Sequence, residues 1–125
     1  MILHGFLGMG DNWKTLARQW SQQGFRVHLI DQRNHGRSFW DSIFSYEAMA
    51  ADLQHYITEQ GIEKCWVLGH SMGGKTAMSW ACQHPEQLLG LVVADIAPKH
   101  YPSHHQAILK GLDSLDFSVL NTRKA

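Results

Sequence analysis

The sequence predicts an α/β fold with a parallel sheet, because short apolar runs alternate with amphipathic stretches along the chain. No linker rich in proline, glycine or serine and no internal repeat interrupts this alternation in the 125 residues. The length is that of one ordinary domain, so residues 1–125 are expected to form a single core. We expect a sheet of about four strands with helices on both of its faces.

The expected elements follow the apolar periodicity in chain order. Four short apolar runs indicate strands, and they cover residues 1–3, 25–30, 65–68 and 91–94. Apolar residues recur at helical spacing in four further stretches, at about 13–20, 46–57, 75–82 and 103–115. Ser45 is a suitable N-cap for the second helix, while Gly24 and Gly61 are suitable stops after the first and second.

Composition excludes some classes of partner. Lysine plus arginine and aspartate plus glutamate both number 11, so no net field favours nucleic acid or an anionic membrane surface. No apolar run approaches the roughly 20 residues of a membrane span. Cys65 and Cys82 are expected in the core rather than in a disulfide, which favours a reducing, cytoplasmic location. The nine histidines are scattered rather than set at metal-ligand spacing, so no metal site is expected.

Residues 69–76 satisfy two functional motifs at once. Gly69, Ser71 and Gly73 form Gly-x-Ser-x-Gly, the strand-to-helix turn that exposes a nucleophilic serine. The same stretch reads Gly-x-x-x-x-Gly-Lys-Thr, a loop that binds nucleotide phosphates. In that alternative Asp95, at the end of an apolar strand, would hold Mg²⁺. Both motifs need a strand before and a helix after, so the local sequence leaves both open.

The rest of the chain favours the nucleophilic serine. Serine hydrolases of this kind take one oxyanion-hole N–H from the residue after the serine and one from an earlier strand-to-helix loop. Residues 4–8, His-Gly-Phe-Leu-Gly, are such a loop, so Phe6 and Met72 are the candidate backbone donors. The phosphate-loop alternative leaves that glycine-rich loop without a role. The hydrolase interpretation uses it, and places Ser71 and Asp95 at the carboxyl edge of the sheet, where α/β sites form.

Four motifs in this order resemble the α/β-hydrolase superfamily, and within it the YbfF/ABHD11-like esterases; they lie at residues 4–6, 31–38, 69–75 and 95–98. The resemblance spans nearly the whole chain. It implies hydrolysis of a small-molecule carboxylic ester or thioester through an acyl-Ser71 intermediate, without metal or organic cofactor. It also implies that Asp95 is the triad acid and that the N–H groups of Phe6 and Met72 form the oxyanion hole.

The resemblance also assigns supporting roles. Asp31, Arg33 and His35 match the family's loop after a central strand, where they are expected to brace the backbone beside the serine rather than perform chemistry. His70, next to the nucleophile, is expected to be structural. Lys75 after the double glycine is a feature of the same subgroup, which weakens the phosphate-loop alternative.

The catalytic histidine of the family follows the acid in chain order. His100, His104 and His105 come after Asp95, and none matches the family position. Family members begin with further strands before Ile2 and continue through a helical cap to two more strands that carry the histidine. We therefore expect a partial α/β-hydrolase core that lacks the cap and the C-terminal strands and has little or no turnover alone. A catalytically inactive remnant of the fold is a second alternative.

Overall fold

A computed structural model describes residues 1–101 and 106–116 and shows a parallel sheet of four strands in the order β2-β1-β3-β4. The strands are β1 (Ile2–Leu3), β2 (Leu29–Ile30), β3 (Cys65–His70) and β4 (Leu88–Ala94). The α-helices are α1 (Lys14–Gln22), α2 (Tyr46–Glu59), α3 (Met72–Gln83) and α4 (Gln106–Asp113), with short 3-10 helices η1 (Gly10–Trp13) and η2 (Pro85–Gln87). The predicted α/β class and the number of strands are confirmed.

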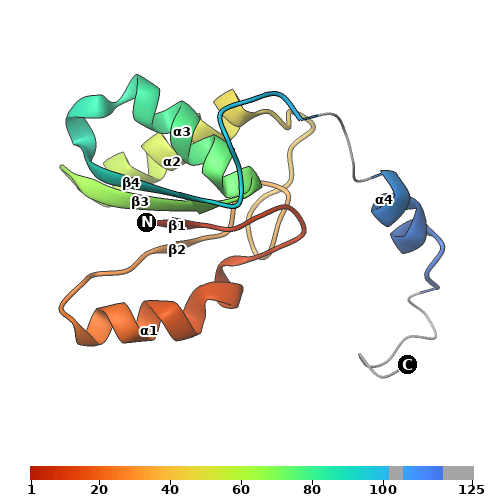
Figure 1. Ribbon diagram of the computed structural model, residues 1–125, viewed down its shortest axis with the longest axis horizontal. Helices are drawn as coiled ribbons and strands as arrows, with labels where there is room; N and C mark the ends of the chain where they lie inside the picture. Colours follow the sequence, from red (N-terminus) through yellow and green to blue (C-terminus); the bar gives the residue numbers. More distant parts are fainter. Residues whose placement is uncertain (102–105, 117–125) are drawn as a thin grey trace.

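Helices cover both faces of the sheet, as predicted. Figure 1 shows α1 on one face and α2 and α3 on the other. The helix α4 buries none of its residues, and Figure 1 shows it apart from the layered body. Residues 103–105 of the predicted last helix lie outside the described residues.

The core lies between the sheet and the helices α2 and α3. Its best-buried side chains are 0–2% exposed and come from both layers: Leu3, Leu53, Ile57, Val67 and Trp80. Burying an aliphatic or aromatic side chain of this size stabilises the fold by about 1.5–3 kcal/mol. The indole N–H of Trp80 donates to Gln54 Oε1 at 2.9 Å, so its one polar group is satisfied. Because α3 contributes heavily to this core, its first turn is held rigidly against the sheet.

Two predicted strand boundaries were wrong. The strand predicted at residues 25–30 is reduced to Leu29–Ile30, because β2 is an edge strand and pairs only with the two residues of β1. The last strand begins three residues earlier than predicted, at Leu88, because it pairs with β3 along its whole length. In both cases the pairing partner, rather than apolarity, sets the length.

The prediction that both cysteines lie in the core was wrong for Cys82. Cys65 is half-buried beside the core, but Cys82 is exposed. Its neighbour Ala81 belongs to the buried face of α3, and the next residue of a helix is turned about 100° away from that face. Within the described part of the chain, no helix is long and apolar enough to cross a membrane.

Candidate active site

Ser71 lies where β3 ends and α3 begins, in a conformation that few residues other than glycine adopt. Its φ and ψ are 50° and −114°, the mirror image of the extended region. Its N–H donates to Ala94 O at 2.9 Å, and its carbonyl accepts the N–H of Gly74 at 2.9 Å. Its hydroxyl does not cap α3. The backbone is therefore fixed on both sides of a hydroxyl that is not occupied by the helix end.

Two glycines make this sharp turn sterically possible. A Cβ atom on Gly69 would overlap the carbonyl of Gly73, and one on Gly73 would overlap the carbonyl of Leu3. The strand, the turn and the helix therefore pass at backbone contact, without room for a side chain. The Gly-x-Ser-x-Gly spacing has a direct physical reason in this structure.

The phosphate-loop alternative was wrong. The helix α3 begins at Met72, so residues 72–74 form its first turn instead of a loop around a phosphate. Thr76 is fully buried, and its hydroxyl donates to Met72 O at 3.2 Å, where it cannot reach Mg²⁺. The ammonium of Lys75 donates to the carbonyl of Lys99. All three features that a phosphate loop needs have other roles.

The glycine-rich loop at residues 4–8 lies directly against Ser71. A Cβ atom on Gly5 would be 3.4 Å from Ser71 Cβ and 2.8 Å from His70 Nδ1. Phe6 follows Gly5, and Met72 contributes the first N–H of α3, which has no carbonyl partner within the helix. The amino end of the 12-residue helix α3, where the helix dipole is positive, also lies directly after Ser71. The two predicted donor residues therefore lie on either side of Ser71, and their role as donors stays a prediction.

His4 and Gln32 hold the start of this loop from the neighbouring strand end. His4 Nδ1 donates to Gly5 O at 2.8 Å, and its Nε2 accepts the N–H of Gln32 at 3.1 Å. Gln32 Nε2 donates to His4 O at 2.7 Å. Burial lowers the pKa of His4, which keeps the ring neutral and able to accept. Neither residue has a role that the sequence predicts, because their pairing crosses 28 residues of chain.

His35 holds the other end of the loop, as predicted. Its Nε2 accepts the N–H of Leu7 at 3.2 Å, and its Nδ1 donates to Arg33 O at 3.0 Å. Leu7 has a φ of 61°, a strained value for a leucine. His35 therefore stabilises the turn that follows Phe6.

Asp31 braces two further loops through main-chain N–H groups. Its Oδ1 accepts from Gly10 at 2.6 Å and its Oδ2 from Arg37 at 2.9 Å. Partial burial raises the pKa of Asp31, but the two N–H groups and the charge of Arg37 outweigh it and leave the pKa below its usual value. The carboxylate is thus ionised and committed to the backbone, which confirms its predicted bracing role.

Arg33 joins the same loop to the helix α2. Its Nε donates to Asp52 Oδ2 at 2.6 Å and its Nη2 to Asp52 Oδ1 at 2.8 Å, a bidentate pair. Its Nη1 donates to Ile43 O at 2.8 Å. All three guanidinium nitrogens donate within the protein, so Arg33 supports the loop as predicted.

Asp95 follows the strand next to Ser71. His70 pairs with Ala94 in the sheet register, so Ser71 and Asp95 are the next residues along two strands that run about 4.8 Å apart. The Asp95 side chain is 87% exposed, and within the described residues Nε2 of His70 lies 3.9 Å from its Oδ2. In that part of the chain the carboxylate caps no helix and accepts no hydrogen bond. Among the described residues, Asp95 therefore serves neither as a helix cap nor as a hydrogen-bonded brace of a loop.

No histidine hydrogen-bonds Ser71 within residues 1–101 and 106–116. The ring of His70 lies 6.0 Å from that of Trp13, at a tilted angle, and against Gly5, contacts that agree with its predicted structural role. His100 is exposed, while His104 and His105 lie outside the described residues. In the described part of the chain, no histidine is thus placed to take the proton of the Ser71 hydroxyl.

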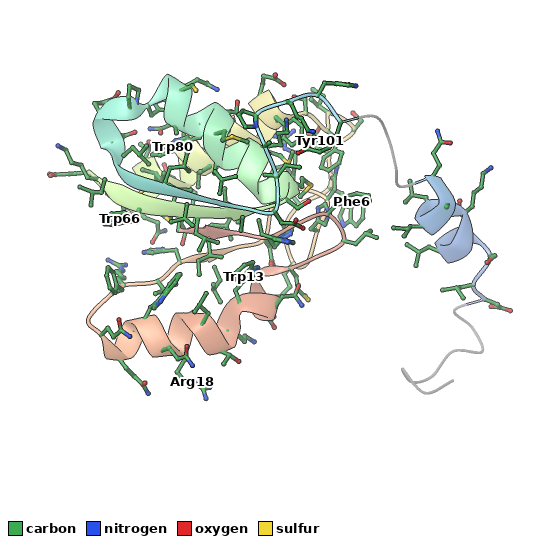
Figure 2. All side chains as sticks on the ribbon, viewed as in Figure 1. Phe6, Trp13, Arg18, Trp66, Trp80 and Tyr101 are labelled. Carbon is green, nitrogen blue, oxygen red and sulfur yellow. The ribbon has the colours of Figure 1, made fainter. Side chains whose placement is uncertain are left out.

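A cavity of about 450 Å³ lies away from this site. Its lining comes from the amino ends of β1 and β3 and from α1 and the residues after it, and includes Met1, Trp20, Phe25 and Trp66. None of the four predicted site residues lines it. Figure 2 labels Trp66 at the end of the sheet opposite to Phe6. The cavity is therefore not the candidate active site.

The fold and the strained serine between a strand and a helix define an α/β-hydrolase. The chain belongs to the alpha/beta hydrolase fold family, whose family model matches residues 1–123. It is 46% identical over 99 residues to the sn-1-specific diacylglycerol lipase ABHD11 of Mus musculus, an alignment that covers 78% of this chain and 32% of that protein. It is 35% identical over 125 residues to the esterase YbfF of Escherichia coli, which covers 99% of this chain and 49% of that one.

A solved structure agrees with the fold over nearly all of the chain. A marine microorganism esterase superposes with a TM-score of 0.91 and 47% sequence identity, and the match covers 98% of this chain and 49% of that one. The chain thus spans about a third to a half of the length of the curated relatives that it matches. These comparisons confirm the predicted family and fold.

Proposed function

We propose that this chain carries the nucleophile, the oxyanion donors and the acid of a serine hydrolase that cleaves carboxylic esters or thioesters. The observation that carries the proposal is the backbone of Ser71, held at φ 50° against the loop of Gly5. Strain of this kind costs of order 1–3 kcal/mol and persists at functional sites. The names of the relatives, esterases and a diacylglycerol lipase, support an ester as the substrate class.

The proposed reaction follows from the positions of these groups. Ser71 Oγ attacks the ester carbonyl carbon, and the oxygen of the tetrahedral intermediate accepts the N–H groups of Phe6 and Met72. The start of α3 adds a favourable dipole at that oxygen. The alcohol or thiol then leaves, and water hydrolyses the acyl-serine. A histidine takes the proton of Ser71 Oγ and returns it to the leaving group, and Asp95 stabilises that histidine in its charged form.

The proposal also covers the substrate, the cofactors and the location of the protein. The substrate is a small molecule, and neither a metal nor an organic cofactor takes part. A cytoplasmic location stays a prediction from the composition.

Covalent labelling tests the nucleophile directly. A fluorophosphonate probe is incubated with the purified chain, and intact mass is measured while circular dichroism reports folding. We expect a single adduct at Ser71, formed slowly because the described residues provide no histidine on its hydroxyl. Ester turnover by the chain alone is expected to be little or none.

Two variants complete the experiment. Ser71→Ala is expected to remain folded and unlabelled, whereas Ser79→Ala, on the same helix with its hydroxyl accepting from Gln83 Nε2, is expected to label like the original chain. An adduct that persists in Ser71→Ala would place the reactive group elsewhere. A folded original chain that stays unlabelled at saturating probe would contradict the proposal and favour an inactive remnant of the fold.

A further inference from the structure

Lys75 links the nucleophile helix to the segment that carries Asp95. It lies in the first turn of α3, and its Nζ donates to the main-chain carbonyl of Lys99. The same ammonium is 5.3 Å from the centre of the Tyr101 ring, and Lys99 Nζ is 5.0 Å from it. One aromatic ring therefore interacts with two cations, an arrangement worth about 0.5–1 kcal/mol for each exposed pair. Figure 2 shows Tyr101 beside the loop that leaves the sheet after β4.

Tyr101 in turn closes the segment upon itself. The N–H of Ala97 donates to the Tyr101 hydroxyl at 3.1 Å, and the N–H of Lys99 donates to Ala97 O at 2.8 Å. Ile96 packs against Gly74, where a Cβ atom would lie 2.6 Å from Ile96 Cγ2. Residues 96–101 thus form a compact turn that rests on the start of α3.

Asp95 itself has few contacts that would fix it. Its side chain is 87% exposed, and its φ is 57°. Before it, Ala94 O accepts the N–H of Ser71. After it, the compact turn is attached to α3 through Ile96 and Lys75. The position of Asp95 therefore depends on how the residues that follow it are held against α3.

Lys75 has no competing role in the described residues. Its ammonium forms no ion pair there, and the start of α3 leaves no phosphate loop for it to serve. A lysine in the first turn of a helix is also unfavourable for the helix dipole. Its position is explained by the carbonyl and the ring that it contacts.

We propose that Lys75 is a positioning residue that holds residues 96–101 against the start of α3 and thereby fixes Asp95 beside Ser71. The consequence for catalysis rests on the proposed function. The attachment itself does not, so the two can be tested separately.

Amide hydrogen exchange of the whole chain tests the attachment. Lys75→Met keeps the length of the side chain but removes its charge and its donors. We expect the Ala97 amide to exchange about tenfold faster in this variant, which corresponds to the loss of one hydrogen bond from a charged donor. The amides of Val67, in β3, and of Ser71, which donates to Ala94 O, are expected to keep their rates. Lys75→Arg restores a cation and a donor and is expected to restore slow exchange at Ala97.

Lys110→Met is the matched control. It removes an exposed lysine on α4 and is expected to change none of these exchange rates. Unchanged exchange at Ala97 in Lys75→Met would overturn the proposal. Equal acceleration at Ala97, Ser71 and Val67 would also overturn it, because it would show general loss of stability rather than release of one segment.

The labelling rate of Ser71 tests the consequence for the reaction. We expect Lys75→Met to lower the rate constant of fluorophosphonate labelling about tenfold, with recovery in Lys75→Arg, because a displaced Asp95 no longer supports the histidine that takes the proton of Ser71 Oγ in the proposed function. If Lys75 acts through Asp95, then Lys75→Met causes no further loss in an Asp95→Asn background. A full tenfold loss in that background would overturn the positioning role. If the original chain is not labelled at all, the proposed function fails, and the exchange rates still decide the attachment.

Discussion

Ser71 and Asp95 end two neighbouring strands at the same level of the sheet, but the structure fixes them by different means. Within the described residues, Ser71 is held by backbone contacts: Gly69 and Gly73 pass at backbone distance, and three main-chain hydrogen bonds join Ser71 to Ala94, Gly74 and Lys75. Asp95 is exposed, and its position depends on side chains outside its own strand, above all Lys75 and Tyr101. The backbone of the sheet and of α3 therefore positions the proposed nucleophile, whereas side-chain contacts that a substitution can remove without unfolding the sheet position the proposed acid.

The largest effect is expected at the backbone contacts of Ser71. In Gly73→Ala the added Cβ would overlap the carbonyls of Leu3 and His4, which are main-chain atoms that cannot move aside. We expect a loss of at least about 3 kcal/mol in the free energy of unfolding, measured by urea denaturation. Gly111→Ala is the matched control, because nothing lies within 4 Å of its new methyl group and alanine favours a helix. Similar stabilities for the two variants would show that the close passage at Ser71 is not required.

The next effect is a loss of stability in acid. Burial lowers the pKa of His4 below its unfolded value of about 6.5, so the folded state binds fewer protons than the unfolded state. The neutral ring contributes stability above that value, and the contribution is lost as the pH falls through the folded pKa. Burial lowers the pKa of His28 as well, with the same sign.

Urea midpoints at pH 7.5 and pH 5.5 measure this loss. We expect the lower pH to cost about 1 kcal/mol through His4, because its folded ring stays neutral as acceptor of the Gln32 N–H while pH 5.5 lies about one unit below its unfolded pKa, and one unit is worth about 1.4 kcal/mol. His4→Gln is expected to reduce the difference between the two midpoints, and His55→Gln, an exposed position on α2, to leave it unchanged. Equal midpoints in the original chain would contradict the account of how the loop at residues 4–8 is held.

Release of strain gives a smaller effect of opposite sign. In Ser71→Gly, a residue that readily adopts φ 50° and ψ −114° replaces one that does not. We expect a gain of about 1 kcal/mol in unfolding free energy, the strain relieved less the entropy that glycine adds to the unfolded chain. Asp95→Gly is the matched variant: its φ of 57° lies in a region that aspartate tolerates, so its stability is expected to change by only a few tenths. Equal gains in unfolding free energy at both positions would show that the backbone of Ser71 is no more strained than that of Asp95.

The smallest effect is expected from the charge of Asp95. Asp95→Asn is expected to change the free energy of unfolding by less than about 0.5 kcal/mol, because the side chain is 87% exposed and accepts no hydrogen bond in the described residues. Asp31→Asn, which weakens the hold on the N–H groups of Gly10 and Arg37, is expected to cost about 1–3 kcal/mol in the same assay. If Asp95→Asn destabilised as much, Asp95 would be a structural residue.

Much of this site could be predicted from residue types in sequence. The spacing of Gly69, Ser71 and Gly73 predicted the turn, because only glycine permits strand and helix to pass at backbone contact. The glycine-rich loop at residues 4–8 was predicted beside it, and the structure places Gly5 against Ser71. Residues 69–76 alone could not decide between the serine turn and the phosphate loop. It depended on where α3 begins, which is set by its packing on the sheet.

The α/β class, the order of the elements and the turn at Ser71 follow from the sequence alone, because periodicity and glycine positions act over a few residues. The length of each strand, the side chains that hold the loop at residues 4–8 and the attachment of Asp95 follow from tertiary contacts. Those contacts join residues 24 to 28 positions apart, such as Lys75 with Lys99 and His4 with Gln32. Local preferences carry no information about such pairs, because the register of the sheet and the packing of α3 create them.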